Sequence, residues 1–307
     1  MKAIQLRDYG GPAATQLADI PAPVAGAGQV LVRVRAAGLN ALDWKVREGF
    51  VRDAFPLQLP AVLGIELAGV VEATGPGATR FQVGDRVMGP LGGLGAYAEQ
   101  VAIDEARLTP TPDALDDVQA AALPVAALAA WQSLNAAGPI GAGSRVLIHG
   151  AAGALGSFAV QFARRAGAFV VGTASGADLA HVRGLGADQV IDYRSQRFEE
   201  AVTDIDLVLA YAAGDVVDRS WAVLKPAGTL VGTASPDFLA RVPAGRQGRW
   251  FVMQPDAALL QTLAAQVAAG TLTSRIGEVV GMADIPAAIE RLRLGGLRGK
   301  SVADFTR

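Results

Sequence analysis

The first part of the chain alternates apolar and polar residues with a period of two. From Gln29 to Val34 every second residue is a valine, and Arg33 lies among the residues of the opposite face. This period predicts a strand with one buried face. Glycine and proline turns separate it from further short apolar runs at 67–73 and 86–88. We therefore expect an irregular β-barrel or sandwich up to about residue 120.

The pattern changes past Pro112. An alanine-rich stretch from Ala114 to Leu134 predicts one helix that joins two domains. After it, helical stretches alternate with short apolar runs at 145–148, 169–173, 189–191, 207–210 and 229–232. Such alternation predicts βαβ units and a parallel sheet covered on both sides. A helix over 256–269 and a strand, helix and strand at 275–281, 285–294 and 300–305 complete the chain.

The strongest local signal is the run Arg145-Val-Leu-Ile-His-Gly-Ala-Ala-Gly-Ala-Leu-Gly156, in which a buried strand leads into glycines and then a helix. Gly153 lets backbone amides approach a pyrophosphate, Gly156 lets the helix pack on the sheet, and the helix start favours an anion. The same run without a ligand would be a simple strand-to-helix turn. The predicted contacts to a dinucleotide are Gly150, Ala151, Ala152, Gly153, Ala154, Leu155 and Gly156.

The choice between NADPH and NADH depends on the end of the next strand, about 20 residues after the glycines, where an acidic residue would bind a free ribose hydroxyl. The strand ends at Thr173, and no acid follows directly. Ser175 either binds a 2′-phosphate or caps the next helix, where Asp178 is expected in the first turn. Tyr193 and Arg194 end the third strand, and Arg194 offers a positive charge. These residues favour NADPH.

Composition excludes several classes of function. The net charge of −2 gives no field for nucleic acid or anionic lipid. The absence of cysteine removes disulfides, thiolate nucleophiles and cysteine-based zinc sites. The longest apolar run, residues 120–131, is too short to span a bilayer, and the charged N-terminus does not resemble a signal peptide. We expect a cytoplasmic protein with no nucleic-acid or membrane partner. His149 and His181 are expected to be structural.

Three further motifs carry a family resemblance. These are Gly38-Leu-Asn-Ala-Leu-Asp-Trp44, Pro60-Ala-Val-Leu-Gly-Ile-Glu-Leu-Ala-Gly69 and Val83-Gly-Asp-Arg-Val87. Together with the glycine run they resemble the zinc-independent quinone oxidoreductase branch of the medium-chain dehydrogenase/reductase superfamily. The resemblance implies an α/β fold, in which a Rossmann doubly wound parallel sheet is joined to a GroES-like irregular β-barrel catalytic domain. The expected limits are 1–122, completed by 271–307, for the catalytic domain and 123–270 for the Rossmann domain.

The resemblance also implies how the chain departs from zinc-dependent relatives. Those enzymes have histidine where this chain has Ile65 and a cysteine ligand where it has Asn40, and neither residue here can replace those zinc ligands. We therefore expect no metal. Further cofactor contacts are implied at Ala212, Thr233, Phe251 and Lys300.

The candidate catalytic residues are Asn40, Asp43 and Lys45. Asn40 is expected to make a polar contact near the nicotinamide or the substrate carbonyl, or else to satisfy local backbone groups. Asp43 and Lys45 either frame the same site or form an ordinary solvated pair. Tyr97 is either a proton donor or a packing residue with its hydroxyl at the surface.

Hydride delivery to an electron-poor alkene or quinone needs no Lewis acid, so the expected activity is NADPH-dependent reduction of a quinone or an α,β-unsaturated carbonyl. Two alternatives stay open. One is a dinucleotide-binding redox sensor or binding module with little catalysis, and the other is an enoyl reductase acting on carrier-bound acyl chains. The resemblance further implies a homodimer, formed through the strand near Phe251.

Overall fold

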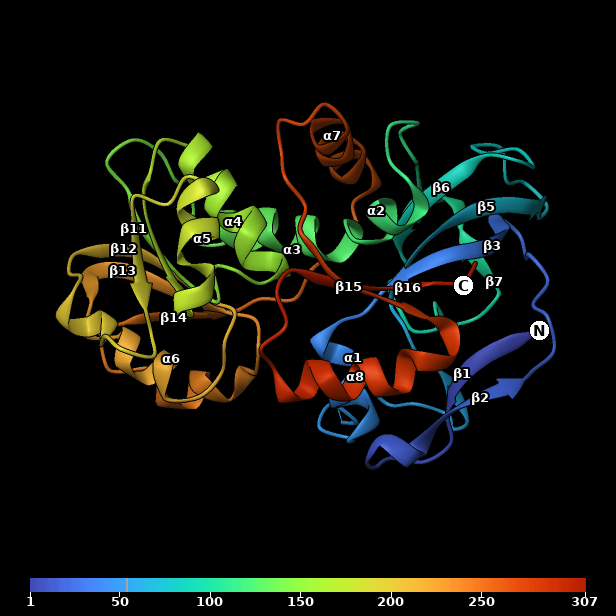
Figure 1. Ribbon diagram of the computed structural model, residues 1–307, viewed down its shortest axis with the longest axis horizontal. Coiled ribbons are helices and arrows are strands. Elements are labelled where there is room, and N and C mark those ends of the chain that lie inside the picture. Colours follow the sequence, from blue (N-terminus) through green and yellow to red (C-terminus); the bar gives the residue numbers. More distant parts are fainter. Residues whose placement is uncertain (54) are drawn as a thin grey trace. The chain divides into compact units, whose positions relative to one another are not determined.

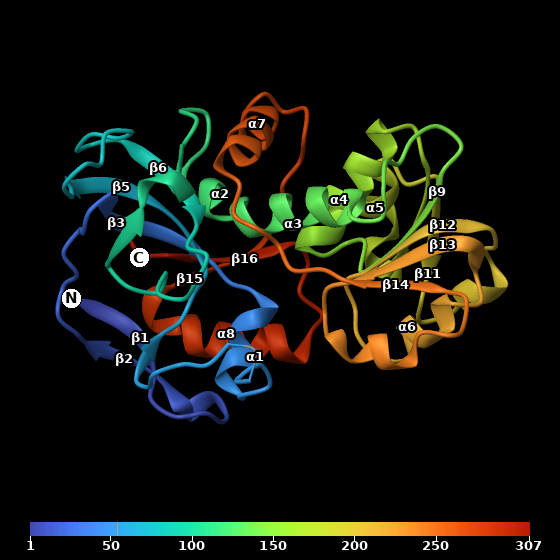
Figure 2. The ribbon, with the colours of Figure 1, turned by 180° about the vertical axis from the view of Figure 1, so that it is seen from behind.

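The computed structural model describes residues 1–53 and 55–307. The chain divides into two compact units, residues 1–125 with 255–307 (unit 1) and residues 126–254 (unit 2). Residues 255–270, which the sequence assigned to the Rossmann domain, fall in unit 1, where helix α7 (Ala257–Ala268) contacts strand β8 (Thr109–Pro110). Both chain termini also belong to unit 1 (Figure 2).

Unit 1 contains two sheets. The smaller is antiparallel, in the order β2 (Thr15–Asp19), β1 (Lys2–Leu6), β4 (Ala61–Val62). The larger runs β15 (Ile276–Gly281), β16 (Lys300–Asp304), β3 (Gln29–Gly38), β5 (Glu66–Thr74), β6 (Arg86–Pro90), β8, with β7 (Gln100–Asp104) also paired to β3. Strand β16 is antiparallel to β3 and places Val302 opposite Gly38. The last strand of the chain is thus built into a sheet that begins near residue 29.

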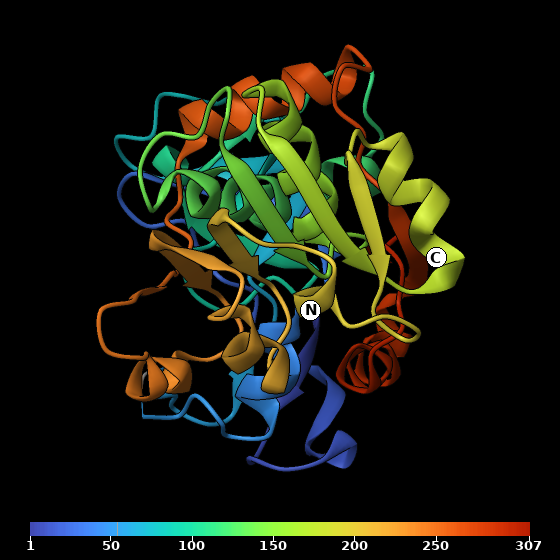
Figure 3. The same cartoon turned by 90° about the vertical axis from the view of Figure 1, so that its left-hand side faces the viewer.

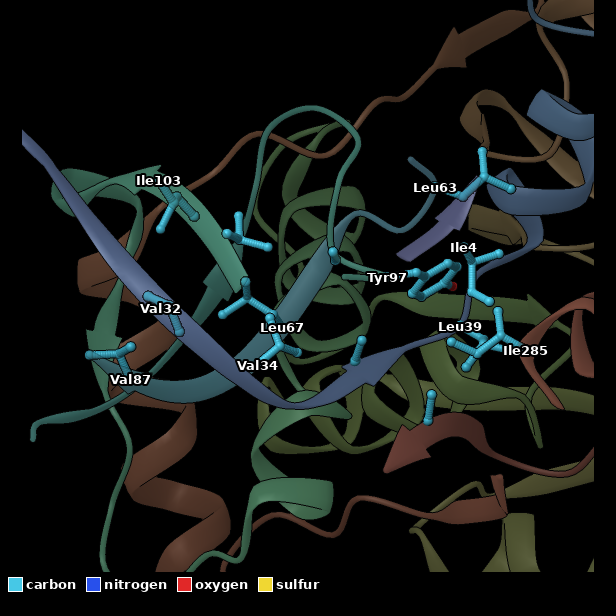
Figure 4. Packing of buried hydrophobic residues seen from close by; sticks show 14 of the residues in the cluster. Ile4, Val32, Val34, Leu39, Leu63, Leu67, Val87, Tyr97, Ile103 and Ile285 are labelled. Carbon is cyan, nitrogen blue, oxygen red and sulfur yellow. The ribbon is translucent and has the colours of Figure 1, made fainter. Parts of the chain in front are cut away.

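The alternation in β3 has the predicted effect. Val30, Val32 and Val34 are buried, whereas Arg33 on the other face is exposed. The valines join an apolar core to which both sheets contribute, together with Leu39 and Ile285 (Figure 4). The apolar side chains of unit 1 thus form one core between its sheets, as a barrel-like domain requires.

The helix predicted over 114–134 is wrong as a single element. The structure has two helices, α2 (Asp117–Ala121) and α3 (Pro124–Asn135). Pro124 lacks an amide hydrogen and disfavours helical geometry at the residue before it, so it starts a new helix instead of continuing the first. Helix α3 lies mostly in unit 2. Besides α2 and α7, unit 1 has the helices α1 (Ala41–Arg47) and α8 (Ile285–Leu294) and the 3₁₀ turns η1 (Pro12–Ala14), η2 (Glu105–Arg107) and η6 (Met282–Asp284).

Unit 2 is built on one parallel six-stranded sheet, whose strands lie side by side in Figure 3. Its order is β11 (Gln189–Asp192), β10 (Phe169–Ala174), β9 (Arg145–His149), β12 (Ile205–Ala210), β13 (Leu224–Gly232), β14 (Gln247–Trp250). This is the doubly wound order of the Rossmann fold, with the reversal between β9 and β12. The predicted parallel sheet is confirmed.

Helices cover both faces of this sheet. Helices α4 (Ala154–Arg165) and α5 (Leu179–Gly184) lie on one face and α6 (Asp215–Ser220) on the other (Figure 1). An apolar stripe of α4 is buried at Phe158, Ala159, Phe162 and Ala163, whereas Ala166, just past the helix, is exposed. Short 3₁₀ turns complete the unit at η3 (Gly176–Asp178), η4 (Phe198–Glu200) and η5 (Pro236–Arg241).

Candidate functional site

The turn from β9 into α4 leaves the start of the helix open to an anion. Gly150 adopts a φ of 74°, and its carbonyl oxygen accepts a hydrogen bond from the amide of Gly153 at 3.0 Å. Gly153 is the N-cap residue of α4 and has no side chain to cap it. The first amides of a helix have no partner within the helix and form its positive end. The residues predicted to contact a diphosphate thus surround a group of backbone donors.

The closeness of α4 to the strand depends on Gly156. A Cβ atom at this position would overlap the carbonyl oxygen of Gly150 and lie 2.7 Å from the Cα of Ala151. No side chain fits in that space. At Gly153, by contrast, a Cβ atom would meet only the Gly150 carbonyl oxygen, at 3.2 Å. Gly156 is therefore needed for packing, whereas Gly153 keeps the approach to the helix start clear.

The predicted adenosine-side residues lie at the carboxyl ends of β10 and β11, which are adjacent parallel strands. Tyr193 is exposed, and the guanidinium of Arg194 lies 5.9 Å from the centre of its ring. The Ser175 hydroxyl donates to the Asp178 carboxylate at 2.9 Å and makes no helix-capping bond. Asp178 lies at the start of α5, as the sequence predicted. Ser175 therefore does not cap the helix as the second alternative expected, and its contact with a 2′-phosphate stays a prediction.

Other predicted cofactor contacts follow the next strands at the same edge of the sheet. The amide of Thr233 donates to the Ala210 carbonyl at 3.3 Å, and that of Phe251 donates to the Gly232 carbonyl at 3.0 Å. Ala212 lines a cavity of about 160 Å³ at the carboxyl ends of β12 and β13. Ligands of doubly wound sheets bind at this edge, next to the strand-order reversal.

His149 ends β9 and is buried. Its Nε2 lies 2.9 Å from the Ser220 hydroxyl, which itself donates to the Val216 carbonyl, so this nitrogen carries the hydrogen. Its Nδ1 then accepts from the Thr173 hydroxyl at 3.1 Å. Burial, together with the nearby Arg219, lowers the pKa of His149 to about 3. The neutral ring ties three elements together, and the structural reading of this histidine is confirmed.

In unit 1, the residues predicted to be catalytic lie at the start of α1. The amide of Asn40 donates to Oδ2 of Asp43 at 2.6 Å, and the Tyr97 hydroxyl donates to the same oxygen at 2.6 Å. Asp43 and Tyr97 are both fully buried. The Tyr97 ring lies among Ile4, Leu63 and other apolar side chains (Figure 4). The expectation that the tyrosine hydroxyl reaches the surface is wrong, because its partner is a buried carboxylate.

Burial dominates the electrostatics of this pair. It raises the pKa of Asp43 to about 6, although the bonds from Tyr97 and Asn40 favour the charged form. Burial and the neighbouring Asp43 raise the pKa of Tyr97 well above its ordinary value. Lys45 is half-buried, burial lowers its pKa, and its ammonium lies 5.6 Å from the centre of the Trp44 ring. Asp43 and Lys45 are thus not an ordinary solvated pair.

A second buried cluster joins α1 to the last strand. Lys300, at the start of β16, lies 2.6 Å from Oδ1 of Asn40 and 2.5 Å from Oε1 of Glu66. The other oxygen of Glu66 accepts from the amide of Val125 at 2.7 Å. Glu66 is fully buried and Lys300 is 3% exposed. Lys300, predicted as a cofactor contact, thus has its ammonium bound to two residues of its own unit.

Two family models match the chain. The model described as alcohol dehydrogenase GroES-like domain matches residues 26–113, and the one described as zinc-binding dehydrogenase matches residues 185–302. Among curated relatives, a quinone oxidoreductase of Pseudomonas aeruginosa is 37% identical over 238 residues, which is 75% of this chain and 72% of the relative. A 2-haloacrylate reductase of a Burkholderia species is 34% identical over 268 residues, 82% of this chain and 80% of that protein.

The chain belongs to the medium-chain dehydrogenase/reductase superfamily, in its quinone oxidoreductase branch. The quinone oxidoreductase of Coxiella burnetii superposes with a TM-score of 0.93 at 33% identity, covering 99% of both chains. The quinone oxidoreductase of Escherichia coli, solved in complex with NADPH, superposes with a TM-score of 0.89 at 25% identity, over 99% of this chain and 100% of the other. An oxidoreductase function follows for this chain.

Residues 1–53 and 55–307 contain neither a metal-binding cluster nor a membrane-spanning helix. No group of three or more histidine, cysteine, aspartate or glutamate side chains in them is arranged to hold a metal ion. Over the same residues, none of the helices is long and apolar enough to cross a bilayer.

Two partners of the candidate catalytic residues, Glu66 and Tyr97, were not predicted from the sequence. Glu66 stood in a quoted motif without a role, and the pairing of Asp43 with Tyr97 was not foreseen. A charged residue inside an apolar run, as Glu66 is between Ile65 and Leu67, was the one available signal. Acids are rarely buried unless they have a partner, so such a position predicts a buried ion pair.

The raised pKa of Asp43 predicts a pH-dependent stability. The folded state holds the Asp43 proton more tightly than the unfolded state, in which the pKa is near 3.8. The contribution of this proton to the free energy of unfolding is therefore largest at low pH and is lost as pH rises through about 6. Asp43→Asn removes the titration. We expect the unfolding free energy of the variant, relative to the unmodified protein, to rise by about 2 kcal/mol between pH 4.5 and 7.5 in urea denaturation. A difference that stays constant with pH would contradict the assignment.

Proposed function

We propose that this oxidoreductase is an NADPH-dependent reductase that transfers hydride, without a metal, to a quinone or an α,β-unsaturated carbonyl. The observation that carries the proposal is the glycine turn between β9 and α4, with its uncapped helix start. A diphosphate suits this turn, because backbone donors and the positive end of α4 face the space that Gly153 leaves clear. The NADPH complex of the E. coli relative supports the choice of dinucleotide.

The two ends of the dinucleotide would meet different residues of unit 2. Arg194 and Tyr193 would bind the 2′-phosphate, one through its charge and the other through its exposed hydroxyl. The Ser175 hydroxyl would have to turn from Asp178 to contribute. The cavity that Ala212 lines, together with Thr233 and Phe251, would receive the nicotinamide side. When bound, the dinucleotide supplies the hydride.

The metal-free part of the proposal rests on the side chains available. The sequence has no cysteine, and Ile65 and Asn40 replace two ligands of the zinc-dependent relatives. Lys300 binds the oxygen of the Asn40 amide and Glu66 accepts from its nitrogen, so the amide has a fixed place in unit 1. Asn40, Asp43 and Lys45 remain the proposed residues of the reaction site. The reductase of 2-haloacrylate, a relative named for an electron-poor alkene, supports the proposed acceptor class.

Pairing of two chains stays a prediction. Strand β14 forms one edge of the unit 2 sheet, and Val252, two residues past its end, is exposed. An open strand edge can pair with a second copy.

The direct test of the proposed activity is steady-state turnover. With NADPH we expect reduction of at least one acceptor from a panel of quinones, enones and alkenals, at a rate that excess EDTA does not change. With NADH the value of kcat/KM should be at least about tenfold lower, because one charge-assisted contact to the 2′-phosphate is lost. Tight NADPH binding with no turnover on any acceptor would instead favour a redox sensor or binding module, and a loss of rate in EDTA would contradict the metal-free mechanism.

The glycine turn is tested by Gly153→Val. The backbone of Gly153 has a φ of −76°, which valine tolerates, so the fold should survive while the side chain blocks the helix start. We expect the dissociation constant for NADPH to rise at least about tenfold in a fluorescence titration. Gly184→Val, on helix α5 where a Cβ atom would meet nothing within 4 Å, is the matched control and should bind normally. Equal affinity in both variants would remove the turn from the binding site.

A further inference from the structure

Each member of the buried cluster of Lys300, Glu66 and Asn40 contacts the other two. Lys300 contacts Oδ1 of Asn40 at 2.6 Å, while Nδ2 of the same amide donates to Oε1 of Glu66 at 2.9 Å. The two charged groups also contact one another at 2.5 Å. Asn40, at 9% exposure, is the most accessible member of the cluster.

The chemistry of the neighbours fixes which way the amide points. An ammonium group can only donate hydrogen bonds, and a carboxylate can only accept them. If the amide were reversed, its NH₂ group would face the ammonium of Lys300 and its oxygen would face the carboxylate of Glu66. Both contacts would be repulsive, and burial would strengthen the repulsion. The two charges therefore hold the amide of Asn40 in one orientation.

In that orientation the amide has one hydrogen-bonding position left. Both hydrogens of Nδ2 are used, one by Glu66 and the other by the Gly38 carbonyl oxygen at 3.2 Å. The oxygen Oδ1 has two acceptor positions, of which Lys300 takes one. Asn40 can thus accept one more hydrogen bond, but it has no hydrogen left to donate.

We propose that Lys300 and Glu66 are positioning residues that make Asn40 an acceptor toward the bound ligand. The inference rests on the proposed function, because it concerns the ligand of that same reaction site. The group that meets Asn40 must carry an N–H or O–H. Two sources offer one, the carboxamide of the nicotinamide and a hydroxyl of the reduced product. A substrate carbonyl, which can only accept, is not the partner of Asn40, and Lys300 acts through Asn40 and not on the cofactor.

The sharpest variant removes both charges together. Lys300→Met alone would leave the Glu66 carboxylate buried without its cation, whereas Lys300→Met combined with Glu66→Gln leaves no unpaired charge. The carboxamide that Glu66→Gln introduces would still accept from the Val125 amide, so its NH₂ group would face Asn40. The amide of Asn40 then gains by reversing, which turns its hydrogens toward the ligand. Lys300→Arg keeps a donor with a positive charge and serves as the conservative control.

The readout is binding and not turnover. Isothermal calorimetry gives the dissociation constants of NADP⁺ and of its analogue in which an acetyl group, without N–H, replaces the carboxamide. A second pair is a hydroquinone and its dimethyl ether, which lacks O–H. For the unmodified protein we expect one of the two pairs to differ about fivefold, the effect of one ordinary hydrogen bond. The pair that differs identifies the source of the donor.

The variants then decide the proposal. The fivefold preference should persist in Lys300→Arg and fall to about one in Asn40→Ala and in the double variant. A preference that survives in either of the last two would overturn it, as would the absence of any preference for both pairs. If this double variant does not fold, Lys300→Leu combined with Glu66→Gln takes its place, because it likewise leaves no unpaired charge, and the preference should again fall to about one. An unmodified protein that binds neither dinucleotide would contradict the proposed function itself, independently of Asn40.

Discussion

The close approach of α4 to the end of β9 is the constraint on which the arrangement of unit 2 depends. It requires that position 156 carry no side chain, because a Cβ atom there would overlap the carbonyl oxygen of Gly150. The approach brings the unpaired amides of the helix start to the edge where β10, β12 and β13 also end. A packing requirement between one helix and one strand thereby brings the helix-start amides to the strand-order reversal, where the proposed diphosphate would bind.

Unit 1 contains two carboxylates, Asp43 and Glu66, that are buried in its apolar interior. Asp43 is bound by Tyr97 and by the amide of Asn40, and Glu66 is bound by Lys300 and by the amide of Val125. Each of these two buried carboxylates therefore has a partner. Removing any one partner would leave a charge with less compensation, so the cluster gives the start of α1 a defined geometry. That geometry is what a reaction site needs from its surrounding residues.

The parts of the fold that depend on local patterns were predictable from the sequence. The period of two in β3, the glycine run after β9 and the alternating strands and helices of unit 2 all appear where expected. The break between α2 and α3 also has a local cause, which is Pro124, but the many alanines around it favoured the prediction of one continuous helix. The pairing of β16 with β3, by contrast, brings Lys300 to Asn40 across 260 positions. No periodicity along the chain reveals that contact, and so the orientation of the Asn40 amide required the structure.

In the proposed function, the turn between β9 and α4 holds the diphosphate of a nicotinamide dinucleotide. A crystal structure of the chain grown with NADPH tests it most directly. We expect diphosphate oxygens within hydrogen-bonding distance of the first amides of α4, with the 2′-phosphate beside Arg194. A dinucleotide bound elsewhere, or an empty turn at saturating NADPH, would remove this turn from the binding site.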